Sequence, residues 1–214
     1  MAPQRRKKSN VAGRGQDVMN QNVLDFAHKH LSSIDIKGKR VLEIGSYNVN
    51  GTIRDVIEPM EPMKYVGVDV REGLCVDEVC DACLLVERFG EESFDFVVTC
   101  STLCHIKNWR QAISSIKRVC KCQGVVFIVA NARWQYRTYG SSFGSDYYDY
   151  WRYTEAVLTT IFSDFKIEVL HADSPKQSLV YLIARKPESF VERGLANIEI
   201  PSAKAQNWGH AHYE

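Results

Sequence analysis

Short apolar segments alternate with helix-like segments through the middle of the chain, and this alternation restricts the fold more than any other feature. Several of the segments are nearly continuous in β-branched and apolar residues, as strands buried on both faces of a parallel sheet are. Strands that alternate with helices predict a parallel α/β sheet. The first five expected strands are residues 40–45, 65–70, 77–81, 94–99 and 124–130.

Helix signals lie between and around these strands. Asn108 is the expected cap of a helix whose apolar face is formed by Trp109, Ala112, Ile113, Ile116 and Cys120, and Gly124 is expected to end the connection to the next strand. Thr154 is expected to cap a later helix.

Two more strands are expected near the end of this region, at 165–170 and 179–184. The short link between them contains Asp173-Ser174-Pro175, which favours an antiparallel hairpin. The expected domain covers residues 17–186, after a disordered basic tail at 1–16. Residues 187–214 are expected to form a tail or arm, packed either on the domain or on a second copy in a homodimer.

Composition excludes several classes of function. The net charge of +1 gives no general attraction to nucleic acid or to an anionic membrane. The longest apolar run, Val125 to Ala130, is far shorter than the ~20 residues of a membrane span, and the polar N-terminus has no secretory signal. The seven cysteines, an odd number, indicate free thiols in a reducing, cytoplasmic compartment. We interpret the CxxC at 80–83 and the CxC at 120–122 as buried small residues, and predict no metal site.

The exit of the first expected strand carries the first candidate site. Ligands of open α/β sheets bind at the carboxyl ends of the strands. The exit has no GxGxxG pattern, and Glu43 lies at the strand end. A carboxylate there would repel a pyrophosphate and would suit a ligand with a cationic amino group and a sulfonium, which favours S-adenosylmethionine over NAD. The loop residues expected at this ligand are Gly45, Ser46, Tyr47, Asn50 and Gly51.

The other strand exits add acceptors of hydrogen bonds. Asp69, followed by Val70, could accept both hydrogen bonds of a ribose diol. Asp81, followed by Ala82, could accept a hydrogen bond from an adenine amino group, and Asp77 is a competitor for that role. The alternative for each acid is a capping role. Cys100 and Ser101 are expected close to the reactive end of the ligand.

These motifs together resemble those of class I methyltransferases. The segments are VLEIGSYNVNGT, YVGVDVREG, VCDA, FDFVVTCSTLCHI and the helix ending in RVCKCQG. They are most similar to small bacterial-type enzymes, the methyltransferase type 11-like family, whose first motif reads VLEIGSxxxNGS; DYWRYT at 149–154 is similar to the family's DYWRFT. Tyr47 and Val49 depart from the broader ExGxGxG pattern.

The resemblance implies a fold, a cofactor and an activity. The fold is Rossmann-like, with a seven-stranded, mostly parallel sheet, an antiparallel last strand and helices on both faces. The cofactor is S-adenosylmethionine, and Glu43, Gly45, Asp69 and Asp81 would contact it. The activity is direct SN2 transfer of a methyl group to an oxygen or nitrogen of a small-molecule acceptor.

Residues near the fourth strand and in the aromatic segment 131–153 are candidates for handling the acceptor. His105 is a candidate general base; the alternative is a histidine packed beside the pocket. Arg152 is a candidate for holding an anionic group of the acceptor; the alternative is a structural salt bridge. The remaining substrate candidates are Arg133, Tyr136 and Trp151.

Two other functions stay open. A nucleic-acid methyltransferase would use the basic N-terminal run to hold phosphates, although the near-neutral charge argues against it. A methyltransferase-like binding protein without catalysis is the other alternative, because the glycine loop is altered.

Overall fold

A single seven-stranded sheet organises the chain. The computed structural model describes residues 21–49, 51–133, 148–173 and 178–204. The strand order is β3-β2-β1-β4-β5-β7-β6, and β7 runs antiparallel to both of its neighbours. The strands are β1 (Arg40–Ile44), β2 (Lys64–Asp69), β3 (Glu78–Val79), β4 (Phe94–Cys100), β5 (Cys120–Asn131), β6 (Lys166–Ala172) and β7 (Leu179–Arg185). The predicted sheet and its reversed last strand are confirmed.

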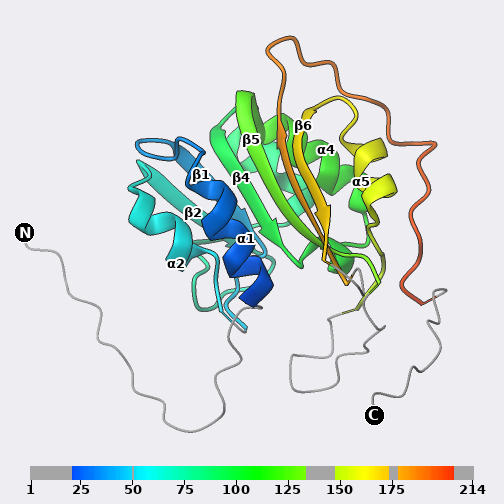
Figure 1. Cartoon of the computed structure of the whole chain (residues 1–214), viewed down its shortest axis with the longest axis horizontal. Coiled ribbons are helices and arrows are strands. Elements are labelled where there is room, and N and C mark those ends of the chain that lie inside the picture. The colour runs from blue at the N-terminus through cyan, green and yellow to red at the C-terminus, as the bar shows by residue number, and fades with distance from the viewer. Residues whose placement is uncertain (1–20, 50, 134–147, 174–177, 205–214) are drawn as a thin grey trace, which may run out of the picture.

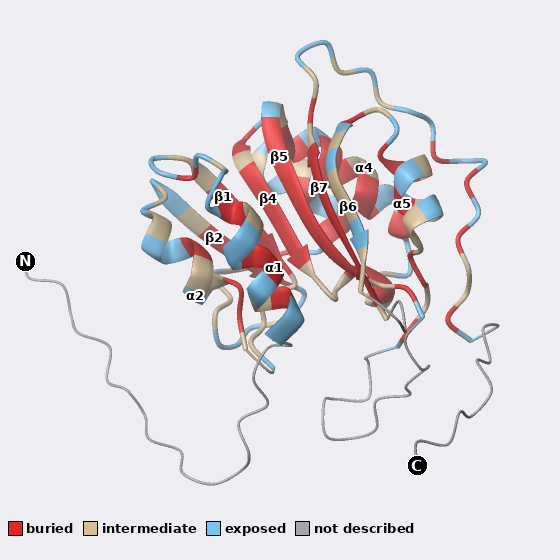
Figure 2. Cartoon of the chain, in the orientation of Figure 1, coloured by how far each residue is buried: buried red, intermediate tan, exposed pale blue. Residues whose placement is uncertain are grey.

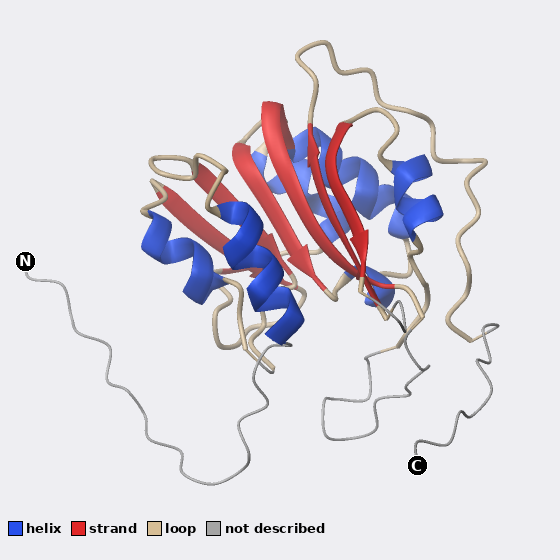
Figure 3. Cartoon of the chain, in the orientation of Figure 1, coloured by secondary structure: helices blue, strands red, loops and turns tan. Residues whose placement is uncertain are grey.

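Helices cover both faces of the sheet (Figures 1 and 3). On one face, Phe26 and Ile57 pack against Phe127 and other strand residues. On the opposite face, Ile113 and Leu158 pack against strand residues of a second core. The helices are α1 (Gln21–Leu31), α2 (Arg54–Ile57), α3 (Leu85–Phe89), α4 (Trp109–Val119) and α5 (Glu155–Ile161), with 3-10 turns η1 (Glu58–Met60), η2 (Ala82–Leu84) and η3 (Leu103–His105).

The central strands are the most deeply buried part of the molecule (Figure 2). Strand β5 is buried continuously from Gly124 to Ala130, as expected for a strand covered on both faces. None of the described helices combines the length and the apolar character that a membrane span requires.

Two predicted strand boundaries were wrong, and one predicted cap lacks its hydrogen bond. Strand β5 begins at Cys120, directly after α4, so Gly124 lies inside the strand. Strand β3 pairs with β2 through only two residues, Glu78 and Val79, so it is shorter than the predicted 77–81. Asn108 precedes α4 but its side chain makes no capping hydrogen bond; Thr154 does cap α5, since its side chain accepts a hydrogen bond from Val157 N.

The described part of the C-terminal segment, residues 187–204, packs on its own domain. The Arg110 guanidinium donates to Leu195 O at 3.0 Å and to Ile198 O at 2.7 Å. Leu195 and Ile198 are buried in the core on the α4 face. Residues 205–214, like the tail at 1–16, lie outside the described residues.

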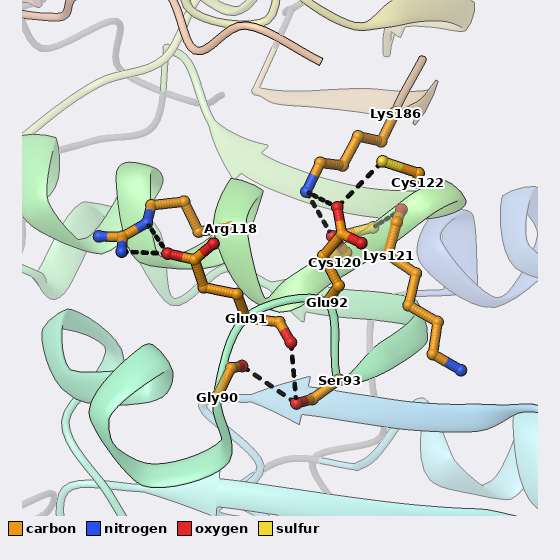
Figure 4. Close-up of polar contacts among 9 residues, drawn as sticks. All are labelled: Gly90, Glu91, Glu92, Ser93, Arg118, Cys120, Lys121, Cys122 and Lys186. Carbon is orange, nitrogen blue, oxygen red and sulfur yellow. Dashed lines mark hydrogen bonds and ion pairs between the residues drawn. The ribbon is translucent and has the colours of Figure 1, made fainter. Parts of the chain in front are cut away.

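The CxC cysteines lie at the amino end of β5, beside Glu92 and Lys186 (Figure 4). Cys120 is buried, while the Cys122 thiol donates to a Glu92 carboxylate oxygen at 2.9 Å. Lys186 lies beside them, 2.7 Å from Cys120 O and 3.4 Å from the same Glu92 oxygen. Cys120 is thus buried as predicted, whereas Cys122 is only half-buried, so the prediction of two buried residues in this motif is wrong for Cys122.

Candidate functional site

The carboxyl ends of β1, β2 and β4 meet at one edge of the sheet. The parallel register aligns Ile44 with Val68 on one side and with Thr99 on the other. The loop that follows β1 bends toward β2, because Gly45 N and Ser46 N both donate to Val68 O, at 2.8 and 3.0 Å. The first, second and fourth strand exits therefore surround one place, where an open α/β sheet binds its ligand.

Asp69 ends β2 with a buried carboxylate that faces the loop after β1. Tyr47 N donates to Asp69 Oδ2 at 3.4 Å, a long hydrogen bond that leaves the carboxylate most of its capacity to accept others. The Tyr47 ring lies against Gly73 and beneath the Arg71 guanidinium, which is 5.7 Å from the ring centroid. Val70 is exposed. The structure thus brings the loops after β1 and β2 together around Asp69.

Glu43 is buried inside the edge and is held by a tyrosine. The Tyr65 hydroxyl donates to Glu43 Oε2 at 2.9 Å, and Glu43 is only 4% exposed. Burial raises the pKa of Glu43 to about 7, against the opposing effects of the Tyr65 hydrogen bond and of nearby Arg54. The residue therefore changes charge near neutral pH. Tyr65 was not predicted as a site residue, although it begins the YVGVD motif, four positions before the strand exit.

The raised pKa predicts an unusual pH dependence of stability. Between pH 4.5 and about 7, folded Glu43 holds a proton that the unfolded chain has released, so the free energy of unfolding should fall as the pH rises. At ~1.36 kcal/mol for each pKa unit, the loss is of the order of 3 kcal/mol. Urea titrations of the wild type and Glu43→Gln across this range measure it.

The pH dependence of the free energy of unfolding contains contributions from many titrating groups. Subtracting the curve of Glu43→Gln from that of the wild type leaves the contribution of Glu43. The free energy of the Glu43→Gln variant should lack this component, whereas Glu168→Gln, on the exposed pair with Arg185, should keep it. Parallel curves for the wild type and Glu43→Gln would contradict the assignment.

Asp77 joins the β2 backbone to Arg54. Its carboxylate accepts a hydrogen bond from Gly67 N at 2.8 Å and pairs with Arg54, which also donates to Cys75 O at 3.1 Å. It precedes β3, at the strand's amino end. Asp77 is therefore no competitor for an adenine at the carboxyl edge, because its carboxylate is committed to Gly67 and Arg54.

Asp81 lies beyond the carboxyl end of β3 and caps a turn. Its Oδ1 accepts a hydrogen bond from Cys83 N at 2.8 Å at the start of η2. The side chain is exposed and Ala82 is buried. The capping alternative is therefore observed, and a contact with a ligand through the exposed carboxylate stays a prediction.

The rest of the first loop is braced by its own residues. Asn48 Oδ1 accepts from Gly51 N at 2.8 Å, and Asn48 N donates to Leu74 O at 2.9 Å. Ser46 is buried, and its hydroxyl points toward β2: a Cβ on Gly67 would lie 2.7 Å from Ser46 Oγ. Among the described residues, Ser46 Oγ has no hydrogen-bond partner. Asn50 lies outside the described residues.

The exit of β4 carries the third part of the site. Cys100 is half-buried, and burial raises the pKa of its thiol well above the ordinary range. The thiol is therefore neutral, which disfavours a role as a nucleophile. Ser101 has a φ of 54° and donates its N–H to Val129 O at 2.8 Å. Thr102 then packs against Gly45. His105 follows at the end of η3, with Nδ1 3.0 Å from Tyr148 O.

The described part of the aromatic segment packs onto η3. Trp151 Nε1 donates to Ile106 O at 3.0 Å and to Lys107 O at 3.1 Å. Arg152 is 1% exposed, and its guanidinium pairs with Asp149 at 2.8 Å. Of the two predicted roles of Arg152, the structural salt bridge is thus observed. Arg133 is exposed, and Tyr136 lies outside the described residues, so their substrate roles stay predictions.

A cavity of about 580 Å³ lies elsewhere, between α1 and the β6–β7 edge. Phe26, His171 and Tyr181 are among its lining residues. None of its lining residues belongs to the first, second or fourth strand exit, so this cavity is separate from the site around Asp69.

The strand order, the reversed β7 and the acidic strand exits define the class I methyltransferase fold. Residues 51–128 match the model of the methyltransferase domain family, beginning directly after the glycine-poor part of the first loop. The chain has the fold of class I, S-adenosylmethionine-dependent methyltransferases, and the match over residues 51–128 covers the central part of that fold. No curated protein matches the chain.

Solved structures of similar fold have diverse reactions. One is the 1,6-didemethyltoxoflavin-N1-methyltransferase of Burkholderia thailandensis with bound 1,6-didemethyltoxoflavin and S-adenosylhomocysteine, at 17% identity, a TM-score of 0.57 and coverage of 78% of this chain and 77% of that one. The CurJ carbon methyltransferase is 14% identical, with a TM-score of 0.56 and coverage of 79% and 54%. The 4+2 cyclase SpnF is 16% identical, with a TM-score of 0.57 and coverage of 78% and 80%. These likenesses show the fold and leave the acceptor open.

Proposed function

We propose that this methyltransferase transfers the methyl group to an oxygen or nitrogen of a small-molecule acceptor by direct displacement. The observation that carries the proposal is the meeting of Asp69 and the loop after β1 at the carboxyl edge, with Glu43 beneath them. A small-molecule nitrogen is the acceptor named for the Burkholderia thailandensis enzyme, which has the same fold.

The charges of the site fit S-adenosylmethionine. Residues 45–52 contain no cationic side chain, and the nearby Arg54 is committed to Asp77. Asp69 would accept the hydrogen bonds of the ribose diol, and Asp81 would serve the adenine edge. Glu43, ionised above about pH 7, would favour the cationic amino acid part of the cofactor. The cofactor supplies an electrophilic methyl group on a sulfonium, and transfer then needs mainly proximity and in-line orientation.

The two alternatives predict different results. A nucleic-acid acceptor would require phosphate contacts, and the net charge of +1 offers little general attraction. A protein that binds the cofactor without turnover would methylate nothing in a panel of phenols, ring nitrogens and oligonucleotides. Mass-spectrometric detection of products from that panel separates the three functions.

Loss of Asp69 should abolish most cofactor binding. Each hydrogen bond to a charged acceptor contributes ~1.5–3 kcal/mol, so Asp69→Ala should weaken S-adenosylmethionine binding at least about 100-fold. Isothermal titration calorimetry measures the change. Asp95→Ala is the matched control, because Asp95 lies at the amino end of β4 and contacts Arg40 N and Lys121.

The control variant should bind the cofactor like the wild type. Equal affinities of the wild type and Asp69→Ala would remove Asp69 from the site. No binding by the wild type would overturn the proposed function.

A further inference from the structure

We infer that His105 and Asp149 form a carboxylate–imidazole dyad that removes the proton of the methyl acceptor, and that Arg152 positions Asp149. His105 Nδ1 lies 3.4 Å from Asp149 Oδ1, and Asp149 Oδ2 accepts a hydrogen bond from Arg152 at 2.8 Å. The inference rests on the proposed function and names its acceptor class: small molecules whose reacting oxygen or nitrogen carries a proton.

The contacts of His105 determine which ring nitrogen can act as a base. Nδ1 faces two acceptors, Tyr148 O at 3.0 Å and Asp149 Oδ1 at 3.4 Å. A nitrogen between two acceptors carries the proton, which leaves Nε2 as the basic nitrogen of the neutral ring. A histidine that accepts a proton at Nε2 becomes an imidazolium, whose charge a carboxylate at Nδ1 stabilises.

The backbone fixes the geometry of the dyad. Tyr150 N donates to Cys104 O at 2.7 Å, so the segment with Asp149 is attached to η3, which carries His105. The Trp151 indole adds the hydrogen bonds to Ile106 O and Lys107 O. Because η3 follows β4 directly, the dyad lies beside the fourth strand exit, where the reactive end of the cofactor is expected.

Arg152 explains how a carboxylate can lie in this buried place. The Asp149 side chain is 3% exposed and that of Arg152 is 1% exposed. A buried carboxylate requires a partner, and the guanidinium supplies one at Oδ2 while Oδ1 faces His105. The guanidinium also donates to Trp151 O at 3.0 Å, which restricts its own orientation. Arg152 therefore acts through Asp149, a different role from the direct substrate contact that the sequence suggested.

A metal ion is the competing explanation for this cluster. Ligand atoms of Cys104, His105 and Asp149 all lie within 4.8 Å of one another. Three features oppose a cation. Asp149 is already paired with Arg152, whose guanidinium would repel a metal ion. Burial and the nearby Asp149 raise the pKa of the Cys104 thiol well above its ordinary range, which disfavours the thiolate that a metal would need. His105 Nδ1 already lies 3.0 Å from a carbonyl oxygen, Tyr148 O.

The proton and electron changes define the acceptor class. The acceptor oxygen or nitrogen forms a bond to the methyl carbon, the carbon–sulfur bond breaks with its electron pair going to sulfur, and the proton of the acceptor goes to His105 Nε2. The proton then passes to water. A base helps most when the acceptor is weakly acidic, and it adds nothing when the acceptor is already ionised.

Nitrogen NMR of the full chain tests the dyad without any acceptor. In ¹⁵N-labelled wild-type protein at pH 8, His105 should be the Nδ1–H tautomer, with its signals assigned by comparison with His105→Gln. Asp149→Asn should shift the His105 ring signals, because it removes the carboxylate charge beside Nδ1, while the proton stays on Nδ1 opposite Tyr148 O. His171→Gln, on the β6 edge, is the matched control and should leave the His105 signals unchanged. An Nε2–H tautomer in the wild type, or no change in Asp149→Asn, would overturn the dyad.

Kinetics test the chemical role. With a series of substituted phenols, His105→Gln should lower kcat ~10²–10⁴-fold for weakly acidic members and much less for nitrophenols ionised at the assay pH. Affinity for S-adenosylmethionine, measured by calorimetry, should be unchanged. Asp149→Asn should show the same dependence on acceptor acidity.

Different results would contradict the catalytic role of the dyad, the acceptor class and the proposed function. An equal loss for every phenol would indicate a structural role, and no turnover of any phenol or ring-nitrogen acceptor by a cofactor-binding wild type would overturn the acceptor class. Stoichiometric bound zinc whose removal abolishes activity would favour the metal site. Failure of wild-type cofactor binding would instead overturn the proposed function, whatever the tautomer of His105.

Discussion

Replacing Gly45 with alanine is expected to lower both the stability of the protein and its affinity for the cofactor. Gly45 has a φ of +76°, and a Cβ at this position would lie 2.0 Å from Thr102 Oγ1 and 2.4 Å from Thr102 Cγ2. The left-handed conformation costs a non-glycine residue ~1–2 kcal/mol, and overpacking costs ~1–3 kcal/mol more. Chemical denaturation and calorimetry with S-adenosylmethionine measure the two effects.

Two further variants separate the backbone cost from the steric cost. Gly38 has a φ of +70°, and a Cβ there would have no other atom within 4 Å, so Gly38→Ala should show the backbone cost alone. Adding Thr102→Gly to Gly45→Ala should recover the steric part. If Gly45→Ala were no more destabilising than Gly38→Ala, the close contact between the first and fourth strand exits would be refuted.

Replacing Lys117 with methionine is expected to be among the most destabilising changes outside the site. Lys117 is fully buried in α4, where its ammonium group donates to Asp164 Oδ2 and to Ile161 O, both at 2.7 Å. Burial lowers the pKa of Lys117, although Asp164 opposes this effect. Breaking a buried pair from one side leaves an uncompensated charge and costs ~3–5 kcal/mol. Urea denaturation measures the loss.

A surface pair provides the matched comparison. Lys121 and Asp95 lie 2.9 Å apart, but their side chains are 37% and 25% exposed, so Lys121→Met should cost no more than ~1 kcal/mol. The double variant Lys117→Met with Asp164→Leu should recover much of the stability, because it leaves no buried charge unpaired. Asp164 also accepts a hydrogen bond from Arg193 N, so recovery should be incomplete. A Lys117→Met protein as stable as Lys121→Met would contradict the energetic role of burial.

Local patterns in the sequence were sufficient to predict the sheet. Residues 124–130 are continuously apolar because both faces of β5 are covered, and 109–120 repeat apolar residues on one helical face because α4 covers one side of the sheet. Asp69 could be placed at a strand exit because it directly follows the apolar run 65–68, whereas Asp81 follows only two apolar residues, Val79 and Cys80. The boundaries of β3 and β5 could not be predicted from the sequence, since pairing with a neighbouring strand decides where a strand begins and ends.

The alternation of strands and helices, with an acid at the exits, was therefore determined by the sequence alone, and so was the resemblance to class I methyltransferases. Only the tertiary structure decided which partner each polar side chain takes. Tyr65 on β2 donates to Glu43 on the neighbouring strand β1, and Asp77 pairs with Arg54. Arg152 turns to Asp149, which in turn faces His105 from a distant part of the chain. Periodicity follows from burial along one segment, whereas these contacts depend on how separate segments close over the sheet.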